Sequence, residues 1–386
     1  MEDPHPTPLA VEDAVRARYS EGATQRVAAL CCPIDYDPKY LAILPAEVIE
    51  RDYGCGDPSR YVREGDVVLD LGSGGGKICF IAQQIVGPTG AVIGVDMNPD
   101  MLDLARRSAP VVSGRVGYSN VTFLRGRIQD LATDLDATDA WLAEHPIRST
   151  EDLTAFEQWK ARAPKMIPDN SVDVVVSNCV LNLVDDAHKG QLIREIFRVS
   201  KVGGRIAISD IVSDEVAPAE LRNDPELWTG CISGAFQEHE LLRMLEEAGF
   251  HAITMDKWDT TPWQTVRGIE FRSATVTALK GKQGPCWEAN QAVIYKGPWK
   301  QVEDDDGHIL RRGERIAVCA KTFAILTSEP YEGQTIGIEP LMAIAPEDRA
   351  AFDCSRTVTR HPRETKGLEY DATTETAACC APGTCC

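Results

Sequence analysis

Basic residues are in short supply in this chain. Of its 386 residues, 40 are Lys or Arg and 59 are Asp or Glu, which leaves a formal charge of −19. A nucleic-acid surface needs clustered cations against the phosphates, so this balance argues against nucleic acid as a partner. It disfavours anionic membrane surfaces for the same reason.

Long apolar runs are also missing, and we expect no secretory leader. No apolar stretch approaches the ~20 residues that span a bilayer. The first 15 residues, MEDPHPTPLAVEDAV, contain acidic residues and three prolines, but no basic segment followed by an apolar one. We therefore expect a cytoplasmic protein with no membrane partner.

Histidine clusters and C-x-x-C pairs, which are common in structural zinc sites, are absent from the sequence. Cysteine itself is plentiful. The thirteen cysteines include three adjacent pairs, Cys31-Cys32, Cys379-Cys380 and Cys385-Cys386. An odd number of cysteines in a chain expected to be cytoplasmic argues against a disulfide framework, so most of these thiols should be reduced.

Short β-branched runs alternate with helical patterns from residue 65 to residue 280. Such alternation predicts a mostly parallel sheet covered by helices on both faces. The expected strands are 67–71, 91–96, 121–126, 172–178 and 205–211, followed by a closing antiparallel pair, 251–259 and 269–280.

A long insertion and two changes of composition divide the remaining chain. Residues 132–166 exceed an ordinary connection and should form a helical excursion, either a lid or an interface. After residue 282, short runs joined by turn residues indicate β structure. From residue 354 the chain is polar and ends in CCAPGTCC, which predicts a flexible tail. The predicted domains are an N-terminal extension (1–64), the α/β domain (65–282), a small β-rich domain (283–353) and the cysteine-rich tail (354–386).

A glycine-rich turn, in VVLDLGSGGGK, follows the first predicted strand. Such a turn lets a ligand approach the backbone at a helix N-terminus, but the dinucleotide pattern G-x-G-x-x-G fails in register. Asp70 would repel a pyrophosphate yet could hold an ammonium group, and Asp96 could accept both hydroxyls of a ribose. S-adenosylmethionine has the cationic end and the ribose without the phosphate. The structural alternative is a turn that Asp70 merely caps.

These features resemble the class I S-adenosylmethionine-dependent methyltransferases over residues 65–280. The resemblance implies a Rossmann-like, mostly parallel seven-stranded sheet. It also implies that the acids bind the cofactor and that the backbone near residue 127 flanks the adenine. The cofactor-binding residues expected on this basis are Asp70, Gly72, Ser73, Gly74, Asp96, Met97, Arg127, Ile128 and Asn178.

Three cysteines fall near the ligand-binding edge of such a sheet. Cys179 ends the fourth strand, Cys231 follows the fifth, and Cys55 lies between two glycines before the first. Each alone is more often a core residue. Together, three thiolates without histidine suit a soft centre, and trivalent arsenic binds three sulfurs while keeping a nucleophilic lone pair.

Three motifs make the resemblance more specific. YGCG (53–56), SNCVLNLV (177–184) and WTGCISGA (228–235) are similar to the arsenite S-adenosylmethionine methyltransferases over most of 15–350. That resemblance implies that Cys55, Cys179 and Cys231 bind As(III). It also implies that Cys31, or its neighbour Cys32, forms a redox pair with Cys55. The substrates would be arsenite and methylarsenite, and the partner a thiol reductant of the thioredoxin or glutathione type.

Other features depart from that family. Gly230 stands where the family has Glu, and the insertion at 132–166 is not a family feature. Two alternatives therefore stay open: a class I methyltransferase of another small acceptor with structural cysteines, and a metalloid-binding buffer protein. The cysteines with no matched role, interpreted as structural or incidental, are Cys79, Cys286, Cys319 and Cys354.

Overall fold

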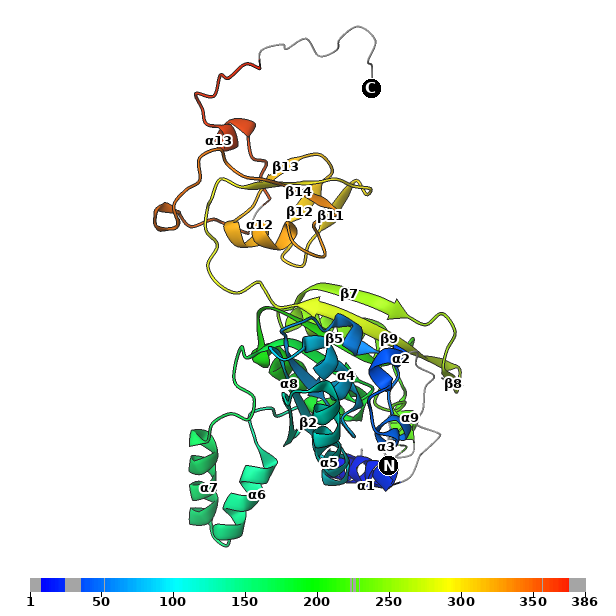
Figure 1. Ribbon diagram of the computed structural model, residues 1–386. Coiled ribbons are helices and arrows are strands. Elements are labelled where there is room, and N and C mark those ends of the chain that lie inside the picture. Colours follow the sequence, from blue (N-terminus) through cyan, green and yellow to red (C-terminus); the bar gives the residue numbers. More distant parts are fainter. Residues whose placement is uncertain are drawn as a thin grey trace. The chain divides into compact units, whose positions relative to one another are not determined.

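The protein is described by a computed structural model. The described residues are 8–24, 36–51, 53–222, 224, 227–228, 230–355 and 357–374, with side chains from residue 12 onward. The chain forms two compact units, Met1–Gly281 (unit 1) and Lys282–Cys386 (unit 2), and each is described by itself (Figure 1).

Unit 1 is built on one sheet whose main path has the strand order β3-β2-β1-β4-β5-β9-β7. The strands are β1 (Val67–Leu71), β2 (Ala91–Asp96), β3 (Val121–Arg125), β4 (Val172–Asn178), β5 (Ser200–Ser213), β6 (Phe236–Gln237), β7 (His251–Trp258), β8 (Gln264–Val266) and β9 (Ile269–Leu279). β1 to β5 run parallel, and β9 is antiparallel to both β5 and β7. The predicted mostly parallel sheet with a closing antiparallel pair is confirmed. Two short strands extend the predicted seven, β6 beside β5 and β8 beside β9.

Helices cover both faces of this sheet. The helices of unit 1 are α1 (Pro8–Thr24), α2 (Pro38–Leu41), α3 (Ala46–Glu50), η2 (Pro58–Tyr61), α4 (Lys77–Val86), α5 (Pro99–Val116), α6 (Leu135–Glu144), α7 (Thr150–Arg162), η3 (Leu181–Leu183), α8 (Asp186–Val199), α9 (Ala219–Arg222) and α11 (Glu238–Glu247). No helix among the described residues is both long and apolar enough to cross a bilayer.

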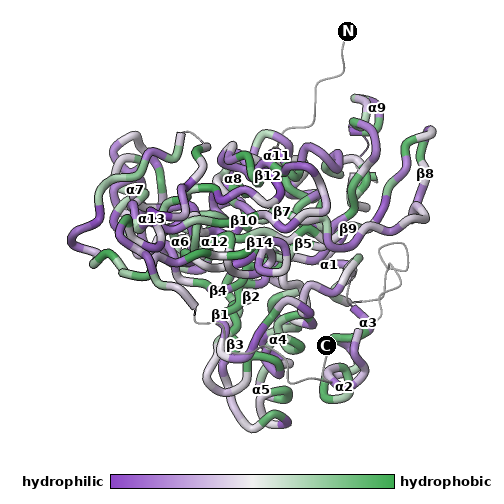
Figure 2. Tube along the Cα trace, turned by 90° about the horizontal axis from the view of Figure 1, so that it is seen from above, coloured by the Kyte–Doolittle hydropathy of each residue, from purple (hydrophilic) through white to green (hydrophobic). Residues whose placement is uncertain are grey.

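Alternation along the strands creates two separate cores. Val68 and Val174 pack with α4 and α5 on one face, whereas Leu69 and Val175, one residue on, pack with α8 and α11 on the other. Successive strand residues point to opposite faces of the sheet. Because helices cover both faces of a parallel sheet, its strands need apolar residues at every position, as these β-branched runs provide. Hydrophobic residues, green in Figure 2, run through these central strands.

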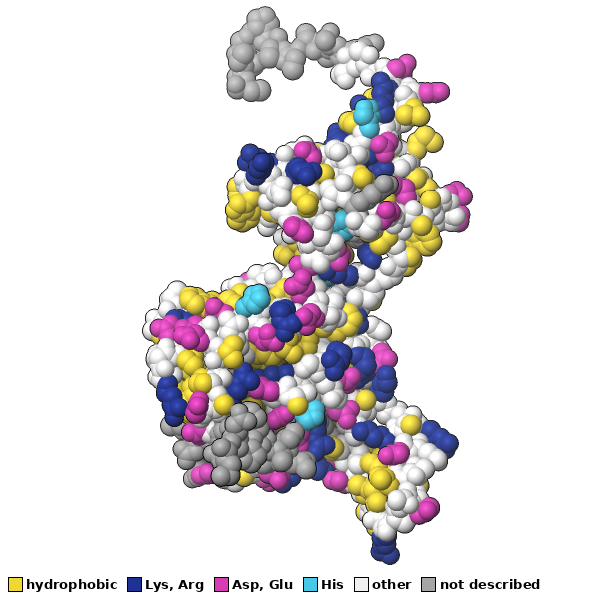
Figure 3. All heavy atoms as spheres, turned by 180° about the vertical axis from the view of Figure 1, so that it is seen from behind, with side chains coloured by type: hydrophobic (Ala, Val, Ile, Leu, Met, Phe, Trp, Pro, Cys, Tyr) yellow, Lys and Arg dark blue, Asp and Glu magenta, His cyan; other side chains and the backbone are white. Residues whose placement is uncertain are grey.

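The insertion forms a helical hairpin of α6 and α7, which projects from the sheet in Figure 1. Asp134 and Ser149 cap the two helices by accepting backbone N–H groups. The helices meet through aromatic rings, with Trp141 stacked on Trp159 at a centroid distance of 5.3 Å. Figure 3 shows hydrophobic side chains gathered on the hairpin. The predicted helical excursion is present.

Unit 2 is small and rich in strands. Its elements are β10 (Ala292–Tyr295), β11 (Gln301–Glu303), β12 (Ile309–Arg311), β13 (Arg315–Ala317), α12 (Ala320–Leu326), β14 (Thr335–Ile338), η4 (Pro346–Asp348) and α13 (Pro362–Lys366). The strands make a three-stranded sheet, β13-β10-β14, and a separate β11-β12 pair. Its core includes Val293, Tyr295, Ile316 and Phe323.

The described part of the predicted tail belongs to unit 2. Arg360 is 4% exposed and its guanidinium binds both carboxylate oxygens of Glu288 at 2.8 and 2.9 Å. Thr359 also bridges to Ile316 of β13. A flexible tail starting at residue 354 is therefore wrong for residues 357–366, because a buried, paired arginine ties this segment to the sheet. Residues 375–386, with the CCAPGTCC motif, lie outside the described residues.

Candidate active site

A cavity opens at the carboxyl ends of the parallel strands of unit 1. Loops after β1, β2, β3 and β4 form its walls, as expected for an open α/β sheet. The predicted cofactor residues that line it are Asp70, Gly72, Ser73, Gly74, Asp96, Met97, Ile128 and Asn178, together with the thiol residue Cys179. Arg127, Cys55 and Cys231 do not line it.

The glycine loop is held by Asp96. Its carboxylate accepts the backbone N–H of Gly74 at 2.9 Å and that of Asn98 at 2.8 Å. Burial raises the pKa of Asp96, and these N–H groups partly oppose the shift. Beside them, Ser73 Oγ is buried without a hydrogen-bond partner among the described residues. This hydroxyl faces the core, because a Cβ at Gly94 of β2 would meet it together with Cys79 Sγ and the Phe123 ring.

Asp70 lies at the base of the loop and is 2% exposed. Its carboxylate accepts a hydrogen bond from the Cys79 thiol at 3.1 Å. Burial, and then the charge of Asp70, raise the pKa of Cys79 well above the ordinary value. A buried carboxylate that lines a cavity favours a cationic ligand group, because pairing offsets the desolvation of the charge.

The prediction for Arg127 concerns its backbone, which would flank the adenine, and its side chain lies elsewhere. Its neighbours Gly126 and Ile128 line the cavity, whereas the Arg127 guanidinium points to Glu12 of α1, with Nε 3.0 Å from Oε2. Gln129 donates to the same carboxylate at 3.0 Å. These bonds tie α1 to the loop after β3, so Arg127 helps to position the helix that borders the cavity.

Helix α1 was not anticipated from the sequence, and it contributes Val15, Arg16 and Tyr19 to the cavity wall. The Tyr19 and Tyr53 rings meet edge to face with centroids 6.0 Å apart, and Tyr53 donates its hydroxyl to Gly22 O at 3.0 Å. Helical spacing of Val15 and Tyr19 was the available signal. Segment 25–35, which holds Cys31 and Cys32, lies outside the described residues. The predicted redox pair with Cys55 therefore stays a prediction.

Cys55, Cys179 and Cys231, the sheet-edge thiols, come together behind one wall of the cavity. All three are buried in one cluster, with exposures of 2%, 7% and 4%. Cys231 Sγ lies 3.4 Å from Cys179 O, and Cys55 Sγ, Cys179 Sγ and an Asp210 carboxylate oxygen lie within 4.8 Å of one another. Cys179 alone belongs both to this cluster and to the cavity wall.

Two of these cysteines occupy left-handed backbone. Cys179 has φ 61° and Cys231 has φ 63°, a conformation that costs on the order of 1 kcal/mol for a residue with a Cβ. Nothing in core packing demands a cysteine there, since glycine would adopt the turn at no strain. Strain of this kind gathers at functional sites, where it aims a side chain.

The glycines on either side of Cys55 allow close packing. A Cβ at Gly54 would collide with the Asn178 amide, and one at Gly56 with the Ser209 side chain. Asn178 Oδ1 accepts the N–H of Cys55 at 2.9 Å and that of Gly56 at 3.0 Å. Asn178 therefore holds the Cys55 loop while it lines the cavity. The glycines therefore make room for the side chains of Asn178 and Ser209.

Cys179 and Cys231 are held in the neutral form. For Cys231, the hydrogen bond to Cys179 and then burial raise the pKa well above the ordinary value. For Cys179, the bond to Cys231 lowers the pKa, but the bond to Cys55, burial and the charge of Asp210 outweigh it. Both residues are therefore thiols at neutral pH before any ligand binds.

Asp210 in β5 is a site residue that sequence reasoning missed, because it sat inside a predicted strand. Its carboxylate accepts N–H groups from Leu181 at 2.9 Å and Ile211 at 2.8 Å. Burial raises its pKa to about 6, against the effect of these N–H groups. It brings a titratable charge beside the thiols.

Comparisons with known proteins identify the family. A model described as a methyltransferase domain matches residues 63–158 and 150–249, and one described as a domain of unknown function matches 282–370. The chain is 30% identical to an arsenite methyltransferase of Aquipseudomonas alcaligenes over 91% of this chain and 93% of the relative. It is 31% identical to one of Homo sapiens over 76% and 72%.

A solved structure extends the likeness to three dimensions. The crystal structure of an arsenic (III) S-adenosylmethionine methyltransferase from Chlamydomonas reinhardtii superposes with a TM-score of 0.55 at 26% identity, covering 83% of this chain and all of that chain, 100%. The sequence likeness covers nearly the whole length of the bacterial relative. The chain therefore belongs to the arsenite methyltransferase family of S-adenosylmethionine-dependent methyltransferases.

Proposed function

We propose that this protein transfers a methyl group from S-adenosylmethionine to trivalent arsenic held by Cys55, Cys179 and Cys231. The main support is the position of Cys179. It lines the cavity together with the glycine loop, and it packs in one buried cluster with Cys55 and Cys231. A group bound by these thiols would therefore border the cavity in which the cofactor is expected.

The cavity residues suit the cofactor. Asp70 would pair with its cationic amino-acid end, and Asp96 would accept the ribose hydroxyls. Apolar side chains of Met97 and Ile128 would pack on the adenine. When bound, S-adenosylmethionine supplies an electrophilic methyl group on a sulfonium.

The neutral thiols suit arsenite. Arsenous acid, As(OH)₃, condenses with three thiols to give As(SR)₃ and three water molecules, so each thiol proton leaves with one hydroxide. Burial keeps both Cys179 and Cys231 protonated, helped by the bond to Cys55 for Cys179 and by the bond to Cys179 for Cys231. The condensation therefore needs no external acid. The product is uncharged, which removes the cost of burying thiolates.

Methylation then uses the arsenic lone pair. The pair forms the As–C bond as the C–S bond breaks, which takes arsenic formally from the trivalent to the pentavalent state. Two electrons must return it, and we propose that Cys55 and Cys31, or its neighbour Cys32, supply them by forming a disulfide. A thiol reductant of the thioredoxin or glutathione type would then reduce that disulfide.

One assay tests this proposal. Purified protein is incubated with arsenite, a thiol reductant and S-adenosylmethionine labelled on the methyl group, and labelled arsenicals are separated. Labelled methylarsenicals are expected. Methyl transfer only to an organic acceptor would instead support the small-acceptor methyltransferase, and tight arsenite binding without turnover would support the buffer protein.

A further inference from the structure

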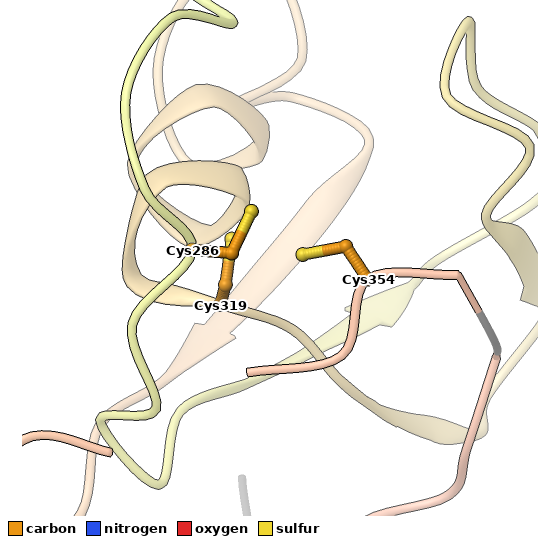
Figure 4. A group of neighbouring side chains, drawn as sticks. All are labelled: Cys286, Cys319 and Cys354. Carbon is orange, nitrogen blue, oxygen red and sulfur yellow. The ribbon is translucent and has the colours of Figure 1, made fainter. Parts of the chain in front are cut away.

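A second group of three cysteines lies in unit 2. Cys286, Cys319 and Cys354, the unit 2 thiols, come from segments more than thirty residues apart, as the numbering shows. Their sulfur atoms lie within 4.8 Å of one another. Figure 4 shows the side chains of Cys286 and Cys354 turned toward Cys319 at the start of α12.

Backbone hydrogen bonds hold the three segments together beside each cysteine. Phe352 N–H donates to Cys286 O at 2.8 Å, and Ala320 N–H donates to Trp287 O at 2.9 Å. Trp287 also bridges to Ala351. The sulfurs are therefore neighbours because the surrounding backbone is paired, which is what a preformed ligand site requires.

The central thiol is oriented as well as buried. Cys319 is 0% exposed, and its Sγ accepts the N–H of Thr322 at 3.4 Å and lies 3.2 Å from Thr322 Oγ1. Cys286 and Cys354 are half-buried, so a ligand can reach the group from their side.

We propose that the unit 2 thiols form a second binding site for trivalent arsenic, separate from the sheet-edge thiols. The choice of arsenic rests on the proposed function, while the existence of a soft-ligand site rests on the thiols alone. Arsenous acid and three thiols give As(SR)₃ and three waters, with no change in oxidation state.

The donor set favours this ligand over zinc. A structural zinc site takes four protein ligands, and the described residues offer three at this point. Three thiolates on Zn²⁺ would also leave a net negative charge, whereas three on As(III) leave none. The three-thiol set is complete for arsenic without a further residue.

Residue-specific alkylation tests the site in the full-length chain. Reduced protein is mixed with arsenite, pulsed with N-ethylmaleimide and digested with trypsin, which places the three cysteines in separate peptides: 283–296, 316–321 and 350–356. We expect arsenite to slow alkylation of Cys286 and Cys354 at least about tenfold, with one shared half-saturation concentration.

In Cys319→Ser, both should react at rates that arsenite does not change. Ala324→Ser, on the exposed face of α12, is the matched control and should keep the protection.

Several results would overturn the site. These are unprotected thiols in the wild type, protection that survives in Cys319→Ser, or stoichiometric zinc in purified protein that Cys319→Ser loses. Cys354→Ser, at a half-buried position, repeats the test with less risk to folding and should free Cys286. Methylation by the same variants at saturating arsenite is measured in parallel. Protection without methylation would refute the proposed function alone, and methylation without protection would refute this site alone.

Discussion

The protein has two groups of three cysteines, which differ in burial, backbone conformation and surroundings. The sheet-edge thiols are all buried, and two of them stand on left-handed backbone. A buried carboxylate, Asp210, lies beside them, and Cys179 borders the cavity of the glycine loop. The unit 2 thiols include two half-buried cysteines on paired backbone segments that belong to another compact unit.

This difference separates binding from chemistry. Three sulfurs are enough to hold a soft centre, and both groups provide them. Methyl transfer also needs a donor held against the bound centre, because positioning accounts for much of such catalysis. Among the described residues, Cys179 of the sheet-edge thiols lines the cavity together with residues suited to the donor, so we expect this group to support turnover. The predictions that follow test that contrast, from the largest expected effect to the smallest.

The sharpest contrast is between serine variants of the two groups. Cys179→Ser and Cys231→Ser should each reduce methylation of both arsenite and methylarsenite by ~10³-fold or more, because a hydroxyl is a poor soft ligand and positioning is lost. Cys319→Ser should leave the rate at saturating arsenite unchanged. Steady-state rates with both substrates provide the measurement. Full turnover in Cys179→Ser would make the two groups equivalent and refute the assignment.

Within the sheet-edge thiols, Cys55 should behave differently from its neighbours. Methylarsenite has only two positions left for thiols, so it should need Cys179 and Cys231 but not Cys55. Cys55→Ser, and separately the double change Cys31→Ser with Cys32→Ser, should lose activity on arsenite and keep measurable activity on methylarsenite. The test is the methylation rate on each substrate, measured with excess thiol reductant. An equal loss of activity on both substrates would show that Cys55 is needed for every methylation step.

We expect binding of the methyl donor, S-adenosylmethionine, to depend on Asp96. Its charge-assisted hydrogen bonds are worth ~1.5–3 kcal/mol each, so Asp96→Ala should weaken S-adenosylmethionine binding by roughly ten- to a hundredfold. Arsenite protection of the unit 2 thiols should not change. Titration calorimetry gives the cofactor affinity, with the exposed Asp103→Ala as control. An unaltered affinity in Asp96→Ala would remove this residue from the cofactor site.

The smallest effect comes from Asp210, the carboxylate that the described residues place beside the sheet-edge thiols. Because the pKa of Asp210 is raised to about 6 in the folded protein, the folded state holds this proton more tightly than the unfolded state. The resulting stabilisation is present at low pH and is lost as pH rises through 6. Between pH 5 and pH 8 the loss should be about 1 kcal/mol. Urea unfolding of wild type and Asp210→Asn at both pH values tests this. A pH dependence that persists unreduced in Asp210→Asn would contradict it.

Much of unit 1 could be read from local sequence. β-branched runs at period two and helical runs between them predict buried parallel strands, and the strands lie within a few residues of those expected. Asp70 and Asp96 were identifiable because their places relative to a strand end and a glycine turn are local features. Such features can be predicted from the sequence because the residues that form them are neighbours along the chain.

Contacts between distant segments could not be read in this way. Helix α1 reaches the cavity through Glu12, which binds Arg127, 115 positions away, and through Tyr19, which meets the Tyr53 ring. Asp210 lay inside a predicted strand, where nothing marked it as a site residue. The flexible tail predicted from residue 354 failed at Arg360, whose burial depends on Glu288, seventy-two positions away. A polar segment looks solvated until its partner is known.

The sequence by itself determined the parallel α/β sheet, the cofactor loop and the family motifs around Cys55, Cys179 and Cys231. Hydrophobic period, turn chemistry and short motifs express forces that act over a few residues. Tertiary structure alone decided which cysteines become neighbours. The same thiol chemistry is present at Cys79, which bonds to Asp70, and at Cys286, Cys319 and Cys354, which interpretation from sequence left without a role. What distinguishes them is the set of side chains that folding brings within a few ångströms, and that set depends on the pairing of distant backbone segments.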